Sequence, residues 1–329
     1  MILGNNLTLV TWRGFIMSEK KRLVTRSDFD GLVCAMILRE CDLIDDIIFV
    51  HPKDVQDGKV ELSNNDITTN LPYDPRVFLC FDHHESEEFR NGDLENIDNW
   101  YCNGEAKSAA RVVYEYYLEA GYDLKRITTE IMEAVDKGDH ADFTEEEILN
   151  PTGWVLMNFI MDARTGLGRF HNFRISNYQL MMELIDYCVN HPIDDVLALP
   201  DVKERVDLYM EQSDLFKEQL KQISHMEGHV VVVDQKAAGD VIYAGNRFMI
   251  YAMYPEALVS VHVAWGFKKQ NTAVMIGKSI INKSSHCDIG NLCLEYGGGG
   301  HTNAGTCQID NDKIDTILPE IIEKINYRC

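Results

Sequence analysis

The sequence lacks the features of several protein classes. No apolar run among its 329 residues approaches the length of about 18 that a membrane-spanning helix needs, so no such helix is expected. Its nine cysteines are scattered and include no CxxC pair, which argues against a disulfide framework and for a reducing, cytoplasmic compartment. Internal repeats and low-complexity segments are absent, and residues 1–16 lack the apolar core and cleavage site of a signal peptide.

Basic residues are also scarce. Lysine and arginine together number 31, against 53 acidic residues, and the formal net charge is −22. A chain this acidic is not expected to bind long nucleic acid through a general basic surface. A small anionic substrate is still compatible with the charge, because bound metal ions reverse the local field.

Length and composition indicate two globular domains. The hydrophobic fraction of 45% is ordinary for a globular protein, and 329 residues are enough for two domains. Residues 17–21, MSEKK, look like a natural start, so we expect residues 1–17 to be a disordered extension. We expect a first domain over residues 18–199, a linker helix over 200–227 and a second domain over 228–329.

Strand and helix patterns alternate in the first domain. Short apolar runs predict strands at 22–25, 47–50, 60–62 and 77–81. Helical patterns lie at 31–40, 107–119 and 127–137. Gly138 is expected to be the C-terminal cap of the last helix, and residues 248–253 of the second domain are expected to be a strand. The alternation predicts an α/β fold: a doubly wound parallel sheet, joined by a long helix to a smaller mixed α/β domain.

Acidic and imidazole side chains follow two of the predicted strands. The run 77–81 leads into Asp82, His83 and His84, and the strand at 22–25 leads into Asp28 and Asp30. Ligands of open α/β sheets bind outside the carboxyl ends of the strands. Imidazole and carboxylate together suit Mn, Fe or Co better than Ca. Asp28 and Asp30 alone would also fit helix capping, but two acid-bearing strand ends in one sheet favour a shared metal centre.

Two further motifs have a functional and a structural interpretation. Arg164, Arg169 and Arg174 gather in a very acidic chain, either as a phosphate or base clamp or as arginines paired with acids. Four glycines at 297–300 precede His301. Such a run indicates close approach of backbone N–H groups to an anion, whereas a tight turn would need only one or two glycines.

Taken in order, the motifs resemble those of the DHH phosphoesterase family. Residues 28–31, DFDG, are similar to its first motif and residues 82–84, DHH, to its signature. Residues 298–305, GGGHTNAG, are similar to the loop of its associated C-terminal domain. The resemblance covers nearly all of residues 18–329. It implies a catalytic first domain that holds two divalent metal ions, usually Mn²⁺, and a second domain that binds substrate.

The resemblance also implies a set of metal ligands. Asp28 would ligate one ion, and Asp30 and His83 the other. In relatives an aspartate after the third strand bridges the ions. Asp66 is the expected match here, and Asp57 is the weaker option. A last ligand follows a helix, where Asp139 is favoured over Asp136.

Other residues are expected to act beside the ions. The resemblance implies that Asp82 and His84 act beside the ligands, either by orienting them or by contacting phosphate. The loop would bind the terminal phosphate or base of the substrate through Gly298, Gly299, Gly300 and His301. Lys283 and Ser284 resemble an Arg-Ser step that precedes this loop in relatives, and would add a phosphate contact.

Arg26 departs from the family pattern. It stands where relatives commonly have a histidine, and a guanidinium offers no lone pair to a metal. Either the first ion has fewer protein ligands, or another side chain such as His51 or His140 replaces the histidine. Arg26 itself would then contact the substrate phosphate or pair with a neighbouring acid.

The resemblance and the two-domain layout imply a metal-dependent phosphodiesterase. Its substrates would be dinucleotides or very short oligoribonucleotides, such as pGpG, which it would hydrolyse to mononucleotides. The alternatives are an exopolyphosphatase and a nucleotide-binding protein whose active site has decayed at Arg26. We expect a short nucleotide as the partner, with no long nucleic acid and no membrane, and leave a homodimer open.

Overall fold

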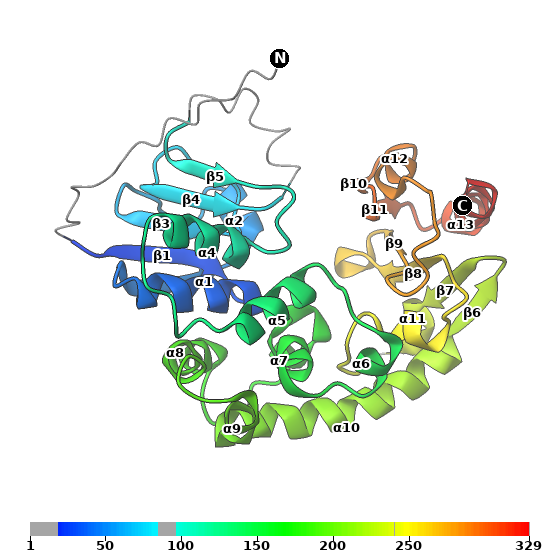
Figure 1. The fold of residues 1–329 in the computed structure, drawn as a ribbon. Coiled ribbons are helices and arrows are strands. Elements are labelled where there is room, and N and C mark those ends of the chain that lie inside the picture. Colours follow the sequence, from blue (N-terminus) through cyan, green and yellow to red (C-terminus); the bar gives the residue numbers. More distant parts are fainter. Residues whose placement is uncertain (1–18, 85–96, 240, 329) are drawn as a thin grey trace, which may run out of the picture.

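The chain folds into two lobes, each built on its own β-sheet (Figure 1). The computed structural model describes residues 19–84, 97–239 and 241–328. The extension expected over residues 1–17 lies outside them. None of the helices in these ranges is long and apolar enough to cross a membrane.

The first sheet is entirely parallel, with the strand order β2-β1-β3-β4-β5. Its strands are β1 (Lys21–Arg26), β2 (Ile44–Val50), β3 (Asp66–Thr69), β4 (Leu79–Asp82) and β5 (Trp100–Cys102). Since parallel strands all end on the same side, the residues that follow them share one edge. Both acid-bearing motifs therefore come to the same edge of this sheet.

Both faces of the parallel sheet are covered. One face packs against a large apolar cluster that includes residues of α1 (Phe29–Glu40), α4 (Ala109–Glu119), α5 (Thr129–Asp139) and α8 (Asn177–Tyr187). A smaller cluster on the strands includes Val24, Leu62 and Trp100, and Val55 of α2 (Pro52–Gln56) packs against it. The predicted doubly wound α/β fold is confirmed.

The turn from β1 into α1 sets the position of the first acidic motif. The side chain of Asp28 caps α1 by accepting the Gly31 N–H at 3.0 Å. Gly31 packs so closely that a Cβ there would lie 2.0 Å from the Arg26 carbonyl oxygen. Only glycine fits this approach, which holds Asp28 and Asp30 at the end of the strand.

The second sheet is mixed, with the order β10-β11-β9-β8-β7-β6. Its strands are β6 (Ser224–Glu227), β7 (Val230–Asp234), β8 (Val259–Trp265), β9 (Thr272–Lys278), β10 (Gly299–His301) and β11 (Ala304–Ile309). Its helices are α11 (Met249–Met253), α12 (Ile289–Leu294) and α13 (Ile314–Arg328). The two lobes are joined by α10 (Pro200–Ile223), which runs along the base of the molecule in Figure 1.

The lobes share a third apolar cluster. Phe143 of the first lobe and Phe248 of the second have ring centroids 5.7 Å apart, and the Asn246 amide donates to the Ile148 carbonyl at 3.1 Å. The remaining helices of the first lobe are α6 (Glu145–Leu149), α7 (Gly153–Met161) and α9 (Ile193–Ala198). This packing lets the first lobe fix the position of the second.

Four predictions about local structure are wrong. Residues 60–62 are not a strand, and the third strand is β3, which begins at Asp66. Residues 249–253 form α11 because they pack with α6 as a buried helical turn. The linker helix ends at Ile223, and 224–227 form an edge strand. Gly138 lies inside α5, where a Cβ would meet the Asn158 amide nitrogen at 1.9 Å.

Candidate active site

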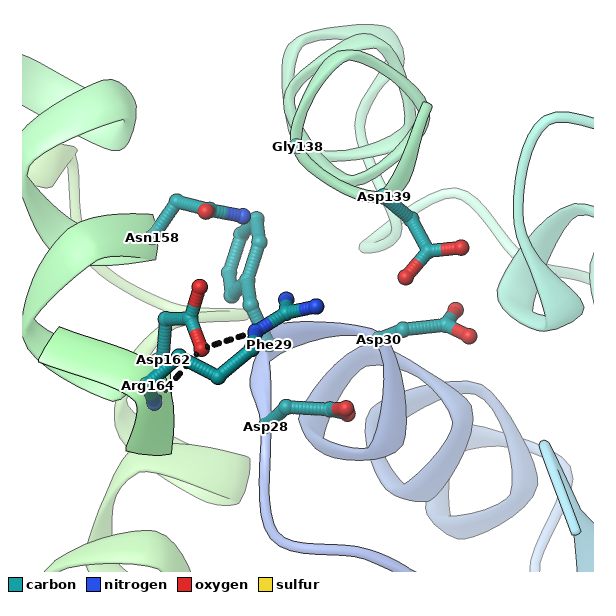
Figure 2. A pocket seen from close by; sticks show the side chains of 8 residues that line it. All are labelled: Asp28, Phe29, Asp30, Gly138, Asp139, Asn158, Asp162 and Arg164. Carbon is teal, nitrogen blue, oxygen red and sulfur yellow. Dashed lines mark hydrogen bonds and ion pairs between the residues drawn. The ribbon is translucent and has the colours of Figure 1, made fainter. Parts of the chain in front are cut away.

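Polar side chains from three strands and one helix meet at the carboxyl edge of the parallel sheet. Asp28 and Asp30 follow β1, Asn70 follows β3, His83 follows β4 and Asp139 ends α5. Figure 2 shows the carboxylates of the three aspartates around one pocket. The pocket is also lined by Phe29, Gly138, Asn158, Asp162 and Arg164.

Asp30 is held by three donors. Its carboxylate accepts the backbone N–H groups of Ala109 at 3.1 Å and Ala110 at 2.8 Å, in the first turn of α4, where the helix dipole favours an anion. It also accepts the Asn70 side-chain amide at 2.7 Å. Burial and the neighbouring carboxylate of Asp139 nevertheless raise the pKa of Asp30 to about 7. A carboxylate has about four lone-pair sites, so one remains for a cation.

His83 offers a ring nitrogen to the same place. Its Nδ1 lies 3.3 Å from the Ala106 carbonyl oxygen, which can only accept, so Nδ1 carries a hydrogen. Its Nε2 is buried and lies 3.0 Å from Oδ2 of Asp139, but the alignment does not make a hydrogen bond. Burial lowers the pKa of His83, but Asp139 and Asp30 outweigh it and raise it to about 9.

Asp139 and Asp136 have different environments. Burial works against the charge of Asp139, but His83 outweighs it and lowers the pKa of that carboxyl. Asp136, one turn earlier, accepts Nε of Arg111 at 3.0 Å and the Ser108 hydroxyl at 2.7 Å. The structure therefore brings Asp139 to the site and pairs Asp136 with an arginine.

Asp30, His83 and Asp139 fit a divalent metal ion. One ligand atom from each lies within 4.8 Å of the others. Two ligands at right angles around an ion with bonds of about 2.1 Å are about 3.0 Å apart, which matches the 3.0 Å between His83 Nε2 and Asp139 Oδ2. The hydrogen bond of His83 Nδ1 to a carbonyl is how metal-ligating histidines are oriented. We call these three residues the triad.

The ligands expected for another ion are not assembled in the described residues. Nε of Arg26 lies 3.0 Å from Oδ2 of Asp28, while Oδ1 of Asp28 accepts the Gly31 N–H. Arg26 thus forms the salt bridge that was one of its two expected roles. His51 caps α2 by accepting the Lys53 N–H at 3.1 Å and His140 is exposed; neither belongs to a group of three potential ligands among the described residues.

Asp66 lies at the opposite edge of the sheet. It begins β3 and pairs with Arg22, whose Nε donates to it at 2.6 Å, and it accepts the Ser63 N–H at 2.6 Å. The expectation that Asp66 bridges two ions conflicts with this position. Its error follows from the misplaced third strand, because the residue after β3 at the site edge is Asn70. Asp57 is paired with lysines beside α2 and is not at the site either.

Asp82 and His84 form a separate pair beside the triad. Asp82 is buried, and its Oδ1 accepts both the His83 N–H at 2.8 Å and Nδ1 of His84 at 2.7 Å. The rings of His83 and His84 have centroids 4.5 Å apart. Although Asp82, His83 and His84 also lie close enough to hold an ion, these hydrogen bonds already use that oxygen of Asp82. Asp82 therefore orients His84 and leaves its Nε2 for other partners.

The three arginines of the 164–174 segment do not form one clamp. Arg164 lines the site pocket, where Asp162 accepts its Nε at 2.7 Å. Burial works against its charge, but Asp162, Asp28 and Asp139 outweigh it and raise its pKa. Arg169 donates to the Ile242 carbonyl at 2.8 Å, and Arg174 is paired with Asp201. Only Arg164 is at the site.

The glycine run lies on the other lobe. Packing explains part of it: a Cβ on Gly298 would lie 2.2 Å from the Thr306 carbonyl oxygen, and one on Gly300 would lie 2.3 Å from that of Ala304. Gly297 has a positive φ of 73°. A Cβ on Gly299 would meet nothing within 4 Å, and His301 is exposed.

Lys283 and Ser284 lie at the boundary between the lobes. Lys283 Nζ lies 2.8 Å from Oδ1 of Asp142, three residues after Asp139, and the Ser284 hydroxyl donates to the Asn282 side chain at 2.7 Å. The loop, Lys283 and Ser284 form no hydrogen bond or ion pair with the triad within the described ranges. Sequence reasoning missed Asn70, whose only signal was a polar residue ending the run 67–69.

Comparisons with known proteins bear on this site. No protein-family model matches the chain, and no curated protein sequence matches it. Among solved structures, it is similar to the pGpG-specific phosphodiesterase PggH of Vibrio cholerae: 52% sequence identity, covering 94% of this chain and 100% of that one, with a TM-score of 0.81. Structures of RecJ from Thermus thermophilus with Mn²⁺ and Mg²⁺ are much more distant, at 11% and 12% identity. They cover 93% and 94% of this chain and 52% and 50% of those chains, with TM-scores of 0.46.

The two aspartates of α5 provide a test of the triad. We expect Asp139→Asn to lose nearly all bound divalent metal, because it removes a ligand, and to remain folded. Asp136→Asn breaks a partly buried ion pair with Arg111 and is expected to lower stability by about 1–3 kcal/mol while keeping the metal. Elemental analysis and thermal unfolding of both variants separate the roles. Loss of metal in Asp136→Asn alone would contradict the assignment.

Proposed function

The chain belongs to the DHH phosphoesterase family, and on that premise we propose that it is a metal-dependent phosphodiesterase of dinucleotides and very short oligoribonucleotides, pGpG among them. Its products would be mononucleotides. One observation carries the proposal: the triad at the carboxyl edge of the sheet, in a chain that is 52% identical over its length to a pGpG-specific phosphodiesterase. The ion we propose is Mn²⁺, since the triad supplies both oxygen and nitrogen ligands.

The side chains divide the work at the site. Asp30, His83 and Asp139 would hold the ion, which when bound supplies a Lewis acid for the phosphoryl oxygen and lowers the pKa of a water. The Ala106 carbonyl keeps the hydrogen of His83 on Nδ1, so Nε2 faces the ion position. Asp82 fixes His84 through Nδ1, and His84 Nε2 would then contact the phosphate.

Arginine supplies the positive charge that a phosphodiester needs. Arg164 lines the pocket beside Asp28, and its guanidinium matches the geometry of phosphate oxygens. Its partner Asp162 holds Nε, which leaves the outer nitrogens of the fork for substrate. The surface of the whole chain is strongly acidic, so these positive groups act only within the pocket.

The second lobe would hold the other end of the substrate. We propose that the Gly298–His301 loop binds a terminal phosphate or base, with Gly299 as the point of closest approach because no packing contact explains its missing side chain. Lys283 forms an ion pair with Asp142 at the boundary between the lobes. Together with Ser284, it would contact phosphate there. We further propose that the protein acts in the cytoplasm, as its scattered cysteines suggest.

Substrate length tests the proposed function. We expect kcat/KM to be highest for dinucleotides and to fall by about tenfold or more, equivalent to about 1.4 kcal/mol, beyond three nucleotides. The reason is that a longer chain must leave the pocket over a surface that repels it. A series of 5′-phosphorylated oligoribonucleotides from two to seven residues, with polyphosphate alongside, gives the measurement. Faster hydrolysis of polyphosphate, or equal rates on long RNA, would replace this proposal with an exopolyphosphatase or a processive nuclease.

The loop is tested by its own variants. We expect Gly299→Ala and His301→Ala to raise KM for pGpG while bound metal is unchanged, because the loop and the triad are on different lobes. Thr302→Ala, an exposed change in the same loop, is the control and should leave KM as it is. Steady-state kinetics and elemental analysis are measured on each. A loss of metal in His301→Ala, or no effect of either substitution, would remove the loop from the substrate site.

A further inference from the structure

The surroundings of Asp28 differ from those of a metal ligand. Its Oδ2 forms an ion pair with Arg26, whose Nε lies 3.0 Å away, and its Oδ1 accepts the Gly31 N–H at 3.0 Å. Arg164 lines the same pocket. Asp28 thus faces two guanidinium groups, which only donate hydrogen bonds and whose positive charge disfavours a cation on its carboxylate.

Arg26 occupies a bridging position. Besides Asp28, its Nη1 donates to Oδ1 of Asn70 at 3.3 Å. Asn70 in turn donates through Nδ2 to Asp30 of the triad at 2.7 Å. The orientation of the Asn70 amide is determined by its partners, because a guanidinium only donates and a carboxylate only accepts. A continuous chain of contacts therefore runs from Asp28 through Arg26 and Asn70 to the metal triad.

The position of Asn70 bears on whether another cation can bind at the site. It is the first residue after β3 at the site edge, it is buried, and it adopts a positive φ of 55°. A carboxylate there could bind two cations at once, whereas a neutral amide carries no charge and offers one acceptor oxygen, which accepts Nη1 of Arg26 at 3.3 Å. The only groups of three potential ligands that the described residues form both contain His83, and neither contains Asp28.

We propose that this chain holds a single divalent ion, at Asp30, His83 and Asp139, and that the guanidinium of Arg26 supplies the second positive charge of the site. This inference rests on the proposed function, and it identifies the two positive groups that would act in the reaction: one divalent ion and the Arg26 guanidinium. Arg26 is fixed by Asp28 and Asn70, and its Nη2 makes no hydrogen bond to any residue that the structure describes. Its side chain is about a quarter exposed (27%), and its guanidinium would donate to a phosphate oxygen of the substrate.

The number of ions is the first test. The full chain is loaded with Mn²⁺ and desalted, and bound Mn²⁺ is counted by elemental analysis and examined by electron paramagnetic resonance. We expect about one ion per chain and the spectrum of an isolated ion. Two ions with an exchange-coupled spectrum would overturn the inference and leave the phosphodiesterase proposal intact. No bound ion in a chain that hydrolyses pGpG would overturn the metal part of both.

Replacing Arg26 and Asn70 with metal-binding side chains is the next test. The double variant Arg26→His, Asn70→Asp replaces a donor and an amide with metal-binding groups, and we expect bound Mn²⁺ to rise from about one to about two per chain. The matched control is Arg22→His, Asn65→Asp, which makes the same changes at the opposite edge of β1 and β3 and should stay at one. A count of one in both variants would show that Arg26 and Asn70 do not exclude an ion.

A single substitution separates the charge of Arg26 from a structural role. We expect Arg26→Gln to lower kcat/KM for pGpG by about 10²–10³-fold, the usual loss when a donor to developing charge is removed. Mn²⁺ affinity should hold or tighten, because the positive charge of Arg26 is felt at Asp139 and repels a cation. A parallel loss of affinity and activity would indicate only a structural role, and unchanged activity would overturn the proposal.

Discussion

The site depends on the cost of gathering carboxylates in a buried place. Asp28, Asp30 and Asp139 meet at the end of a parallel sheet, where repulsion and burial both oppose their charge. The protein offsets this with a backbone helix terminus at Asp30, with His83 at Asp139 and with Arg26 at Asp28. The charge that is not offset leaves a negative pocket, which favours binding of a divalent ion. The donors around the three aspartates are thus explained by the need to stabilise buried negative charge.

The same constraint explains which site residues were predictable. Asp28, Asp30 and His83 follow strands that the apolar pattern identifies, so their meeting at one edge follows from the parallel order. Asp66 was misplaced because Val60 and Leu62 look like a strand, whereas they pack as an irregular segment on the sheet. The four-residue β3 is too short and too rich in threonine to stand out, so the polar residue at its end was only a weak signal.

Tertiary packing accounts for the remaining errors. Gly138 has the pattern of a helix cap, but the space it leaves is filled by the Asn158 side chain of α7, which no local pattern reveals. Residues 249–253 are apolar enough for a strand, yet they are a buried helical turn between the lobes. The fold class depends on longer patterns, and it was predicted correctly.

The ion is expected to bind among Asp30, His83 and Asp139 at the carboxyl edge of the first sheet. Anomalous diffraction from crystals of the Mn²⁺-loaded chain, recorded at the manganese absorption edge, locates the metal without reference to activity. We expect one anomalous peak within bonding distance of His83 Nε2 and of the carboxylates of Asp30 and Asp139, with the Arg26–Asp28 pair intact. A peak between Asp28 and Asn70 with Arg26 displaced, or none at the triad, would contradict it.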